Sequence, residues 1–120
     1  PISSASDFIY NERGSCASDA VKQMVNRIVR EDMAARNELI AIWNEAKLNG
    51  IDEPSLLEYV EDTAALLEES QRLNFLRWPI LDQWVHMNFQ ALGSYEAEVG
   101  TVKSYIKERI PKLDELINNY

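Results

Sequence analysis

Apolar residues recur three or four positions apart through most of this chain, and that period constrains its fold more than any other feature. The spacing is the one that places residues on a single side of an α-helix. It predicts a helix over Asp19–Glu31 with Ser18 as its N-cap. It predicts a second helix over Asp32–Leu48, which the pair Asn49-Gly50 stops.

A third helix is predicted to begin after Asp52, which can cap it, and to run close to Phe75. Pro54 falls in the first turn, where its missing N–H has no helical partner in any case. Because Pro79 disfavours helical geometry at the residue before it, the helix should end by Trp78. From Trp78 to Ser94 no clean period is visible, so we expect an irregular segment with one short helical turn around Gln83–Asn88.

The helical period returns after Gly93-Ser94 and continues almost to the last residue. Pro111 lies inside this pattern and should bend the helix without breaking it. The stripes predicted to be buried are Val21, Met24, Val25, Ile28 and Val29; Ala35, Leu39, Ile42, Trp43 and Ala46; Leu56, Leu57, Val60, Ala64, Leu67 and Gln71; and Val99, Val102, Ile106, Ile110, Leu113 and Ile117.

The pattern therefore predicts an all-α fold. We expect an irregular bundle of four main helices, with an aromatic-rich irregular segment before the last one. No strand-like alternation and no internal repeat interrupts it. Residues 1–17 are interpreted as a linker or N-terminal extension, and residues 18–120 as a single helical domain around one core.

Charge and composition narrow the classes of partner. The chain has 20 acidic and 12 basic residues, a net charge of −8, which repels nucleic-acid phosphates and anionic lipids. No apolar run reaches the roughly 20 residues of a membrane span. Cys16 is the only cysteine, so an internal disulfide and a cysteine-rich zinc site are both excluded. We expect neither nucleic acid nor a membrane span among its interactions.

Individual residues give weak signals for chemistry. His86 is the only imidazole, and its nearest acidic neighbour in sequence is Asp82. Catalytic or metal-binding histidines work beside other ligands or bases, so a histidine at the edge of a core is the favoured interpretation. Cys16 has no histidine near it in sequence, which argues against a nucleophile. A small enzyme that uses His86 is retained only as a third alternative.

The third predicted helix carries a run of carboxylates, namely Glu58, Glu61, Asp62, Glu68 and Glu69. They lack the Glu-x-x-His pattern of di-iron bundles, and their spacing is typical of a solvated helix face. The four glycines are scattered and form no phosphate-binding loop. The sequence predicts no catalytic residue, no cofactor-binding residue and no metal ligand in this chain.

Four aromatic residues crowd into the stretch RLNFLRWPILDQWVHMNF: Phe75, Trp78, Trp84 and Phe89. They could line a ligand pocket, because aromatic rings supply large contact areas. An irregular segment also needs buried side chains to stay ordered, and this favours anchoring onto the helices over ligand contact.

Three segments occur in the order VNRIVREDMAARNELIAIWNEAK, LLEYVEDTAALLEESQRLNFLRWPILDQWV and YEAEVGTVKSYIKERIPKLDELI. In order and spacing they resemble the C-terminal end of the spore-coat CotH family over roughly Val25 to Ile117, and NF-x-RWPIL is the most specific part. The chain departs from the family pattern at Met33-Ala34, Pro111 and Lys112. The residues that stand at the places of the family motifs are Asp32, Met33, Trp43, Asn44, Glu45, Asn74, Phe75, Arg77, Trp78, Pro79, Ile80, Leu81, Tyr95, Glu96, Glu98, Val99, Lys103, Arg109 and Asp114.

The resemblance implies a part of an atypical, secreted protein kinase. In that family the ATP-binding lysine and the catalytic and metal-binding aspartates lie upstream of this helical end, so ATP and a divalent metal would belong to the parent protein. The expected partners are the upstream part of the same protein, continuing before Pro1, and a protein substrate. The expected location is extracellular, on the cell surface or in a spore coat. The resemblance thus suggests a scaffolding or substrate-docking subdomain without catalysis of its own.

A second hypothesis assigns a different class of function. In it, the chain is a self-contained helical module that binds a partner protein through exposed aromatic residues. Self-association separates the two hypotheses, because large uncovered apolar patches drive association. A tightly folded monomer favours the self-contained module, and a chain that self-associates favours the subdomain.

Overall fold

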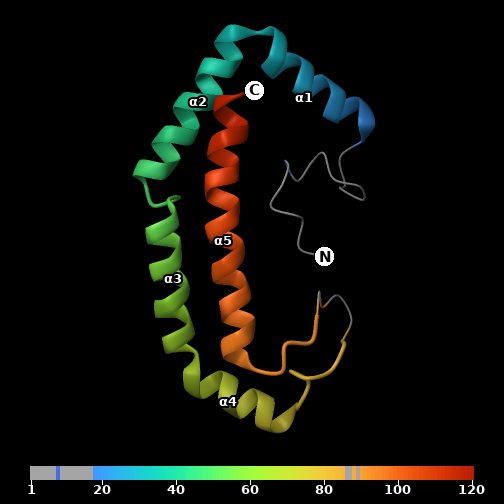
Figure 1. Ribbon diagram of the computed structural model, residues 1–120, viewed down its shortest axis with the longest axis vertical. Helices are drawn as coiled ribbons and strands as arrows, with labels where there is room; N and C mark the ends of the chain where they lie inside the picture. Colours follow the sequence, from blue (N-terminus) through green and yellow to red (C-terminus); the bar gives the residue numbers. More distant parts are fainter. Residues whose placement is uncertain (1–7, 9–17, 86–87, 89) are drawn as a thin grey trace. The chain divides into compact units, whose positions relative to one another are not determined.

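The computed structural model describes residues 8, 18–85, 88 and 90–120, and this part of the chain is helical without a strand (Figure 1). The all-α prediction is confirmed. Five helices are present among these residues: α1 (Asp19–Glu31), α2 (Met33–Leu48), α3 (Glu53–Leu66), α4 (Glu68–Arg77) and α5 (Tyr95–Asn118).

Helix α1 has the predicted bounds, α2 begins one residue later than predicted, at Met33, and polar side chains cap both N-termini. The Ser18 hydroxyl accepts a hydrogen bond from the backbone N–H of Val21 at the start of α1. Asp32 separates α1 from α2, and its carboxylate accepts from the N–H groups of Ala34 and Ala35 at 2.8 and 3.2 Å. These bonds satisfy N–H groups that have no partner inside the helix. The boundary between the two helices is thus a single capping residue.

Helix α2 ends in a Schellman motif at the predicted stop signal. The N–H of Ile51 donates to the carbonyl of Ala46 at 3.0 Å, and the N–H of Gly50 donates to that of Lys47 at 3.4 Å. This arrangement requires the left-handed backbone found at Gly50, where φ is 94°. Glycine adopts it without the steric cost that a Cβ imposes.

The predicted third helix is in fact two helices, α3 and α4. The break is at Leu67, whose ψ of −3° departs from the roughly −42° of an α-helix. The chain changes direction there, and α4 runs across the end of α3 (Figure 1). No proline or glycine marks this position, and no side chain caps the start of α4. Helix α4 then ends at Arg77, before Trp78 and Pro79, as predicted.

The segment between Trp78 and Ser94 is irregular at its described residues, as predicted. A hydrogen bond from the N–H of Gly93 to the carbonyl of Leu81, 2.9 Å long, joins its two ends. The helical turn expected around Gln83–Asn88 is not found at the described residues of that range, which lie outside any helix. Their turn-type hydrogen bond runs from the N–H of Asn88 to the carbonyl of Val85.

Helix α5 begins where the period predicted it. The Ser94 hydroxyl accepts a hydrogen bond from the N–H of Ala97 at 3.1 Å. The helix continues through Pro111 and is not broken there. A proline removes only one backbone hydrogen bond, and the long helix on both sides tolerates that loss.

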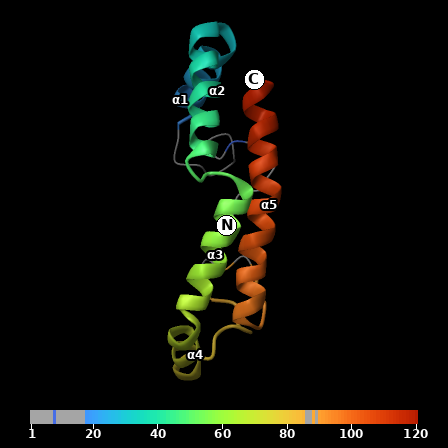
Figure 2. The ribbon, with the colours of Figure 1, turned by 90° about the vertical axis from the view of Figure 1, so that its left-hand side faces the viewer.

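The described residues fall into two compact units. One comprises Glu53–Lys107 and holds α3, α4 and the first part of α5, with α3 beside α5 (Figures 1 and 2). The other combines the described residues of Ser3–Asp52 with Glu108–Tyr120, and holds α1, α2 and the last part of α5.

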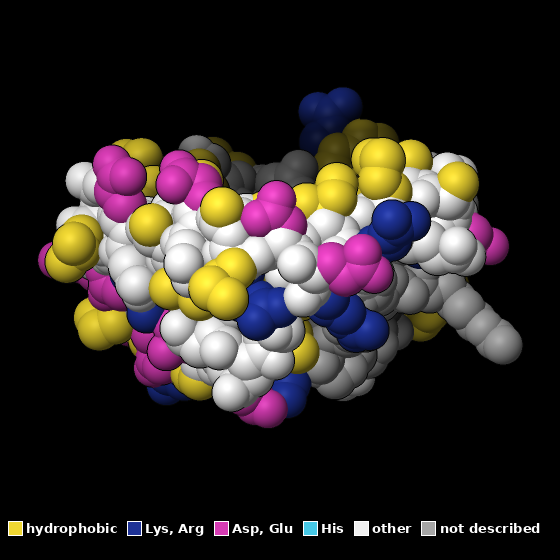
Figure 3. Space-filling view, turned by 90° about the horizontal axis from the view of Figure 1, so that it is seen from above, with side chains coloured by type: hydrophobic (Ala, Val, Ile, Leu, Met, Phe, Trp, Pro, Cys, Tyr) yellow, Lys and Arg dark blue, Asp and Glu magenta, His cyan; other side chains and the backbone are white. Residues whose placement is uncertain are grey.

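Few side chains are enclosed. Among the described residues only Trp43 and Ile117 are buried hydrophobics, with 9% and 5% of their surface exposed. Apolar side chains lie at the surface among acidic and basic ones (Figure 3). The large exposed hydrophobics are Val21, Met24, Ile28, Met33, Ile42, Leu48, Ile51, Tyr59, Leu66, Leu67, Leu73, Leu76, Trp78, Ile80, Trp84 and Val102. Most of the predicted stripes are thus only partly covered.

Candidate interaction surfaces

Trp43 is the best-defined anchor of α2 against the last part of α5. Its indole N–H donates to the Asp114 carboxylate at 2.8 Å, and the Lys47 ammonium donates to the same oxygen. The ammonium also lies 5.7 Å from the centre of the Trp43 ring, within cation–π range. The hydrogen bonds from Lys47 and then Trp43 hold the pKa of Asp114 below its ordinary value. This cluster fixes structure, since its polar groups satisfy one another.

The sequence predicted that Trp43 is buried, but it did not reveal the roles of Lys47 and Asp114. Asp114 is separated from Trp43 by 71 positions, so no local motif connects them. Tyr120 also contacts residues far away in the sequence. Its hydroxyl donates to the Asn26 side-chain oxygen at 2.6 Å, and its ring stacks on Phe8. Residues so far apart in the sequence meet only because the segments that carry them pack against each other.

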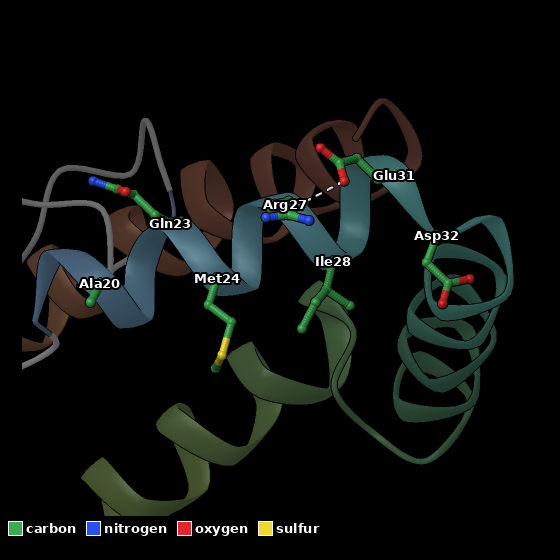
Figure 4. A pocket seen from close by; sticks show the side chains of 7 residues that line it. All are labelled: Ala20, Gln23, Met24, Arg27, Ile28, Glu31 and Asp32. Atoms are coloured by element: carbon green, nitrogen blue, oxygen red, sulfur yellow. Dashed lines mark hydrogen bonds and ion pairs between the residues drawn. The ribbon is translucent and has the colours of Figure 1, made fainter.

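Helix α1 presents an apolar stripe along an open depression (Figure 4). Ala20, Met24 and Ile28 project from the same side of the helix, and an Arg27–Glu31 ion pair of 3.0 Å lies away from them. The Met24 and Ile28 side chains are 56% and 47% exposed. Gln23 and Asp32 also line the depression, and the Asp32 carboxylate caps the start of α2, so the exposed apolar stripe is the part suited to packing.

A second depression lies between α3 and the first part of α5. Ala64, Val99 and Gly100 form its small and apolar part, and Lys103 and Lys107 border it. Lys103 pairs with Glu61 of α3, and its hydrogen bond lowers the pKa of Glu61. The Glu61–Lys103 ion pair therefore links α3 to the first part of α5 at this place.

The predicted anchoring role of the tryptophans is wrong. Trp78 and Trp84 are 56% and 69% exposed, and only Phe75 of the described aromatic residues in this stretch is half-buried. The Arg77 guanidinium lies 5.5 Å from the Trp78 ring centre, which covers part of one indole face. Phe89 lies outside the described residues. The aromatic residues of this stretch indicated a large contact area, but the sequence did not show whether residues of the same chain cover it.

The carboxylate run is solvated, as predicted. Glu58, Glu61, Asp62, Glu68 and Glu69 are all exposed, and they lie on two helices instead of one. Their ion pairs are Glu61 with Lys103 and Glu69 with Arg72. The hydrogen bond with Arg72 lowers the pKa of Glu69.

No grouping of histidine, cysteine and carboxylate side chains suited to a metal ion occurs in the part of the chain that the structure describes. His86 and Cys16, the two residues considered for catalysis, lie outside that part. Within it, no helix has the length and apolar character needed to cross a membrane.

Comparison with known proteins gives no relative. No protein-family model, curated protein or solved structure matches this chain.

Proposed function

We propose that this chain is a helical interaction subdomain, which provides scaffolding or docking and does not carry out catalysis by itself. The observation that carries the proposal is the exposure of large apolar side chains on every helix while only Trp43 and Ile117 are buried among the described residues. A helix is stabilised in water mainly by covering its apolar face. Exposed apolar surface of this extent is typical of a site where another polypeptide packs.

The sequence resemblance suggests which polypeptide would cover the exposed apolar side chains. In a CotH-like protein the covering polypeptide would be the kinase-like part upstream of this chain, and that part would hold ATP and the metal. The positions that carry the resemblance include Trp43 and Asp114, and these two side chains are hydrogen-bonded to each other in this chain. Because the resemblance places the ATP-binding lysine and the catalytic and metal-binding aspartates upstream, the proposal assigns no phosphate transfer to this chain.

The test of the interaction role uses the isolated chain. A hydrophobic dye should bind it while circular dichroism still reports folded helices, and sedimentation should show association that grows with concentration. A compact monomer without dye binding would overturn the subdomain and would favour the self-contained module.

The absence of catalysis is tested by incubating the chain with ATP and Mg²⁺ and a general acceptor protein. We expect no phosphate transfer. Transfer by this chain alone would contradict the proposal.

A further inference from the structure

The outer side of α3 combines two apolar side chains with carboxylates that make no ion pair among the described residues. Tyr59 and Leu66 are 69% and 83% exposed, and they are seven residues apart. Residues at this separation lie on the same side of a helix, two turns apart. Glu58 and Asp62 are exposed beside them and make no ion pair within the described part of the chain. The inner side of α3 is the partly covered one, where Glu61 meets Lys103 of α5.

The charge on α3 is of one sign. Its sequence EPSLLEYVEDTAAL contains four carboxylates and neither lysine nor arginine. Glu68 and Glu69 at the start of α4 extend the negative charge within the same unit. Of all these groups, only Glu61 and Glu69 have cationic partners among the described residues. The surface around Tyr59 and Leu66 is therefore apolar at its centre and acidic at its border.

We propose that this outer α3 surface, defined by Glu58, Tyr59, Asp62 and Leu66, docks a cationic amphipathic helix of a partner protein. Apolar residues of the partner would cover Tyr59 and Leu66, and its lysines or arginines would approach Glu58 and Asp62. Anchors spaced along a helix face are suited to a second helix packed against them. The proposal rests on the proposed interaction function and names the chemistry of the partner.

The negative charge of the outer α3 surface disfavours three other occupants: a second copy paired through the same surface, nucleic acid and anionic lipid. A second copy that pairs through its own α3 surface would bring the same carboxylates against this surface, and like charges in contact destabilise a complex. Nucleic acid and anionic lipid are repelled for the same reason. A basic partner gains favourable electrostatic interactions that also increase its rate of association.

The experiment measures binding of labelled designed helices to the full chain by fluorescence anisotropy. The probe carries leucine on one face and lysine on the other. Its controls are the same design with glutamate in place of lysine, and a peptide of the same leucine and lysine composition in scrambled order. We expect the amphipathic cationic helix to bind most tightly, and its affinity to fall as salt is added.

Matched variants locate the site. Leu66→Ser should weaken binding about tenfold, whereas Leu48→Ser, at an 88% exposed leucine of α2, should not. Glu58→Gln with Asp62→Asn should weaken binding roughly threefold, more than Glu38→Gln with Glu45→Gln, which remove the same charge from α2. Circular dichroism confirms that each variant is folded.

Three outcomes overturn the proposal: equal binding of the glutamate or scrambled peptide, equal effects of the α2 and α3 variants, or a dimer of the chain that Leu66→Ser dissociates. The dye and sedimentation results for the unmodified chain stay valid in each case. Failure of this docking site is therefore distinguishable from failure of the general interaction role.

Discussion

The indole N–H of Trp43 donates to the Asp114 carboxylate across 71 positions of the chain, and Lys47 donates to the same oxygen. Trp43 is one of the two buried hydrophobic residues among those described, so this bond positions the largest enclosed side chain. Asp114→Ala leaves the indole N–H without its partner, and we expect a loss of about 1–2 kcal/mol in the free energy of unfolding. Urea unfolding followed by circular dichroism measures it.

The control for this prediction is Asp62→Ala, at an exposed carboxylate that makes no ion pair within the described residues. It should change the unfolding free energy by less than about 0.5 kcal/mol. Equal effects of the two variants would show that the Trp43–Asp114 bond does not stabilise the fold.

The stabilisation from Asp114 should depend on pH. Its folded-state pKa is lowered, chiefly by the Lys47 ammonium, so the contribution is fully present above the unfolded value of roughly 3.9. It is lost as the pH falls through the folded pKa. The difference in unfolding free energy between the unmodified chain and Asp114→Asn should therefore shrink between neutral pH and about pH 3. A difference that grows in acid would contradict this assignment.

The Asp32 carboxylate caps α2 by accepting hydrogen bonds from Ala34 and Ala35. Asp32→Ala should lower the unfolding free energy by about 1 kcal/mol, because two N–H groups lose their acceptor. Asp32→Ser, which keeps a capping oxygen, should lose less. Thermal melts of the two variants compare them, and an equal loss would exclude capping as the cause.

Two glycines should respond with opposite sign to the same substitution. Gly50 has a φ of 94°, so Gly50→Ala should destabilise the chain by about 1–2 kcal/mol although no atom lies within 4 Å of the added Cβ. Gly100 lies inside α5 and also has open space around it, so Gly100→Ala should stabilise by about 0.5–1 kcal/mol. Chemical unfolding of both variants provides the test.

Local signals made most of the helices predictable. Ser18 and Asp32 at the N-termini and Asn49-Gly50 at a C-terminus are residues whose own chemistry starts or stops a helix. The break at Leu67 was not predictable, because no proline or glycine marks it and Leu66 and Leu67 are followed by good helix formers.

The candidate surfaces were harder to predict for a different physical reason. Helical periodicity shows which residues share a face, but it does not show whether anything in the same chain covers that face. Trp43 and Trp78 both occur among apolar neighbours, yet one is buried and the other is more than half exposed. The acidic character of α3 was visible in the sequence, whereas the position of Tyr59 and Leu66 on its outer side required the structure.

The most direct test of uncovered apolar surface is acrylamide quenching of tryptophan fluorescence in two folded variants. Trp78→Phe with Trp84→Phe retains only Trp43, and Trp43→Phe retains the other two. Exposed surface predicts that Trp78 and Trp84 are quenched strongly and Trp43 weakly, and that dye binding accompanies the strong quenching. Equal protection of all three indoles in the isolated chain would mean that it covers its own apolar faces, which would contradict the account.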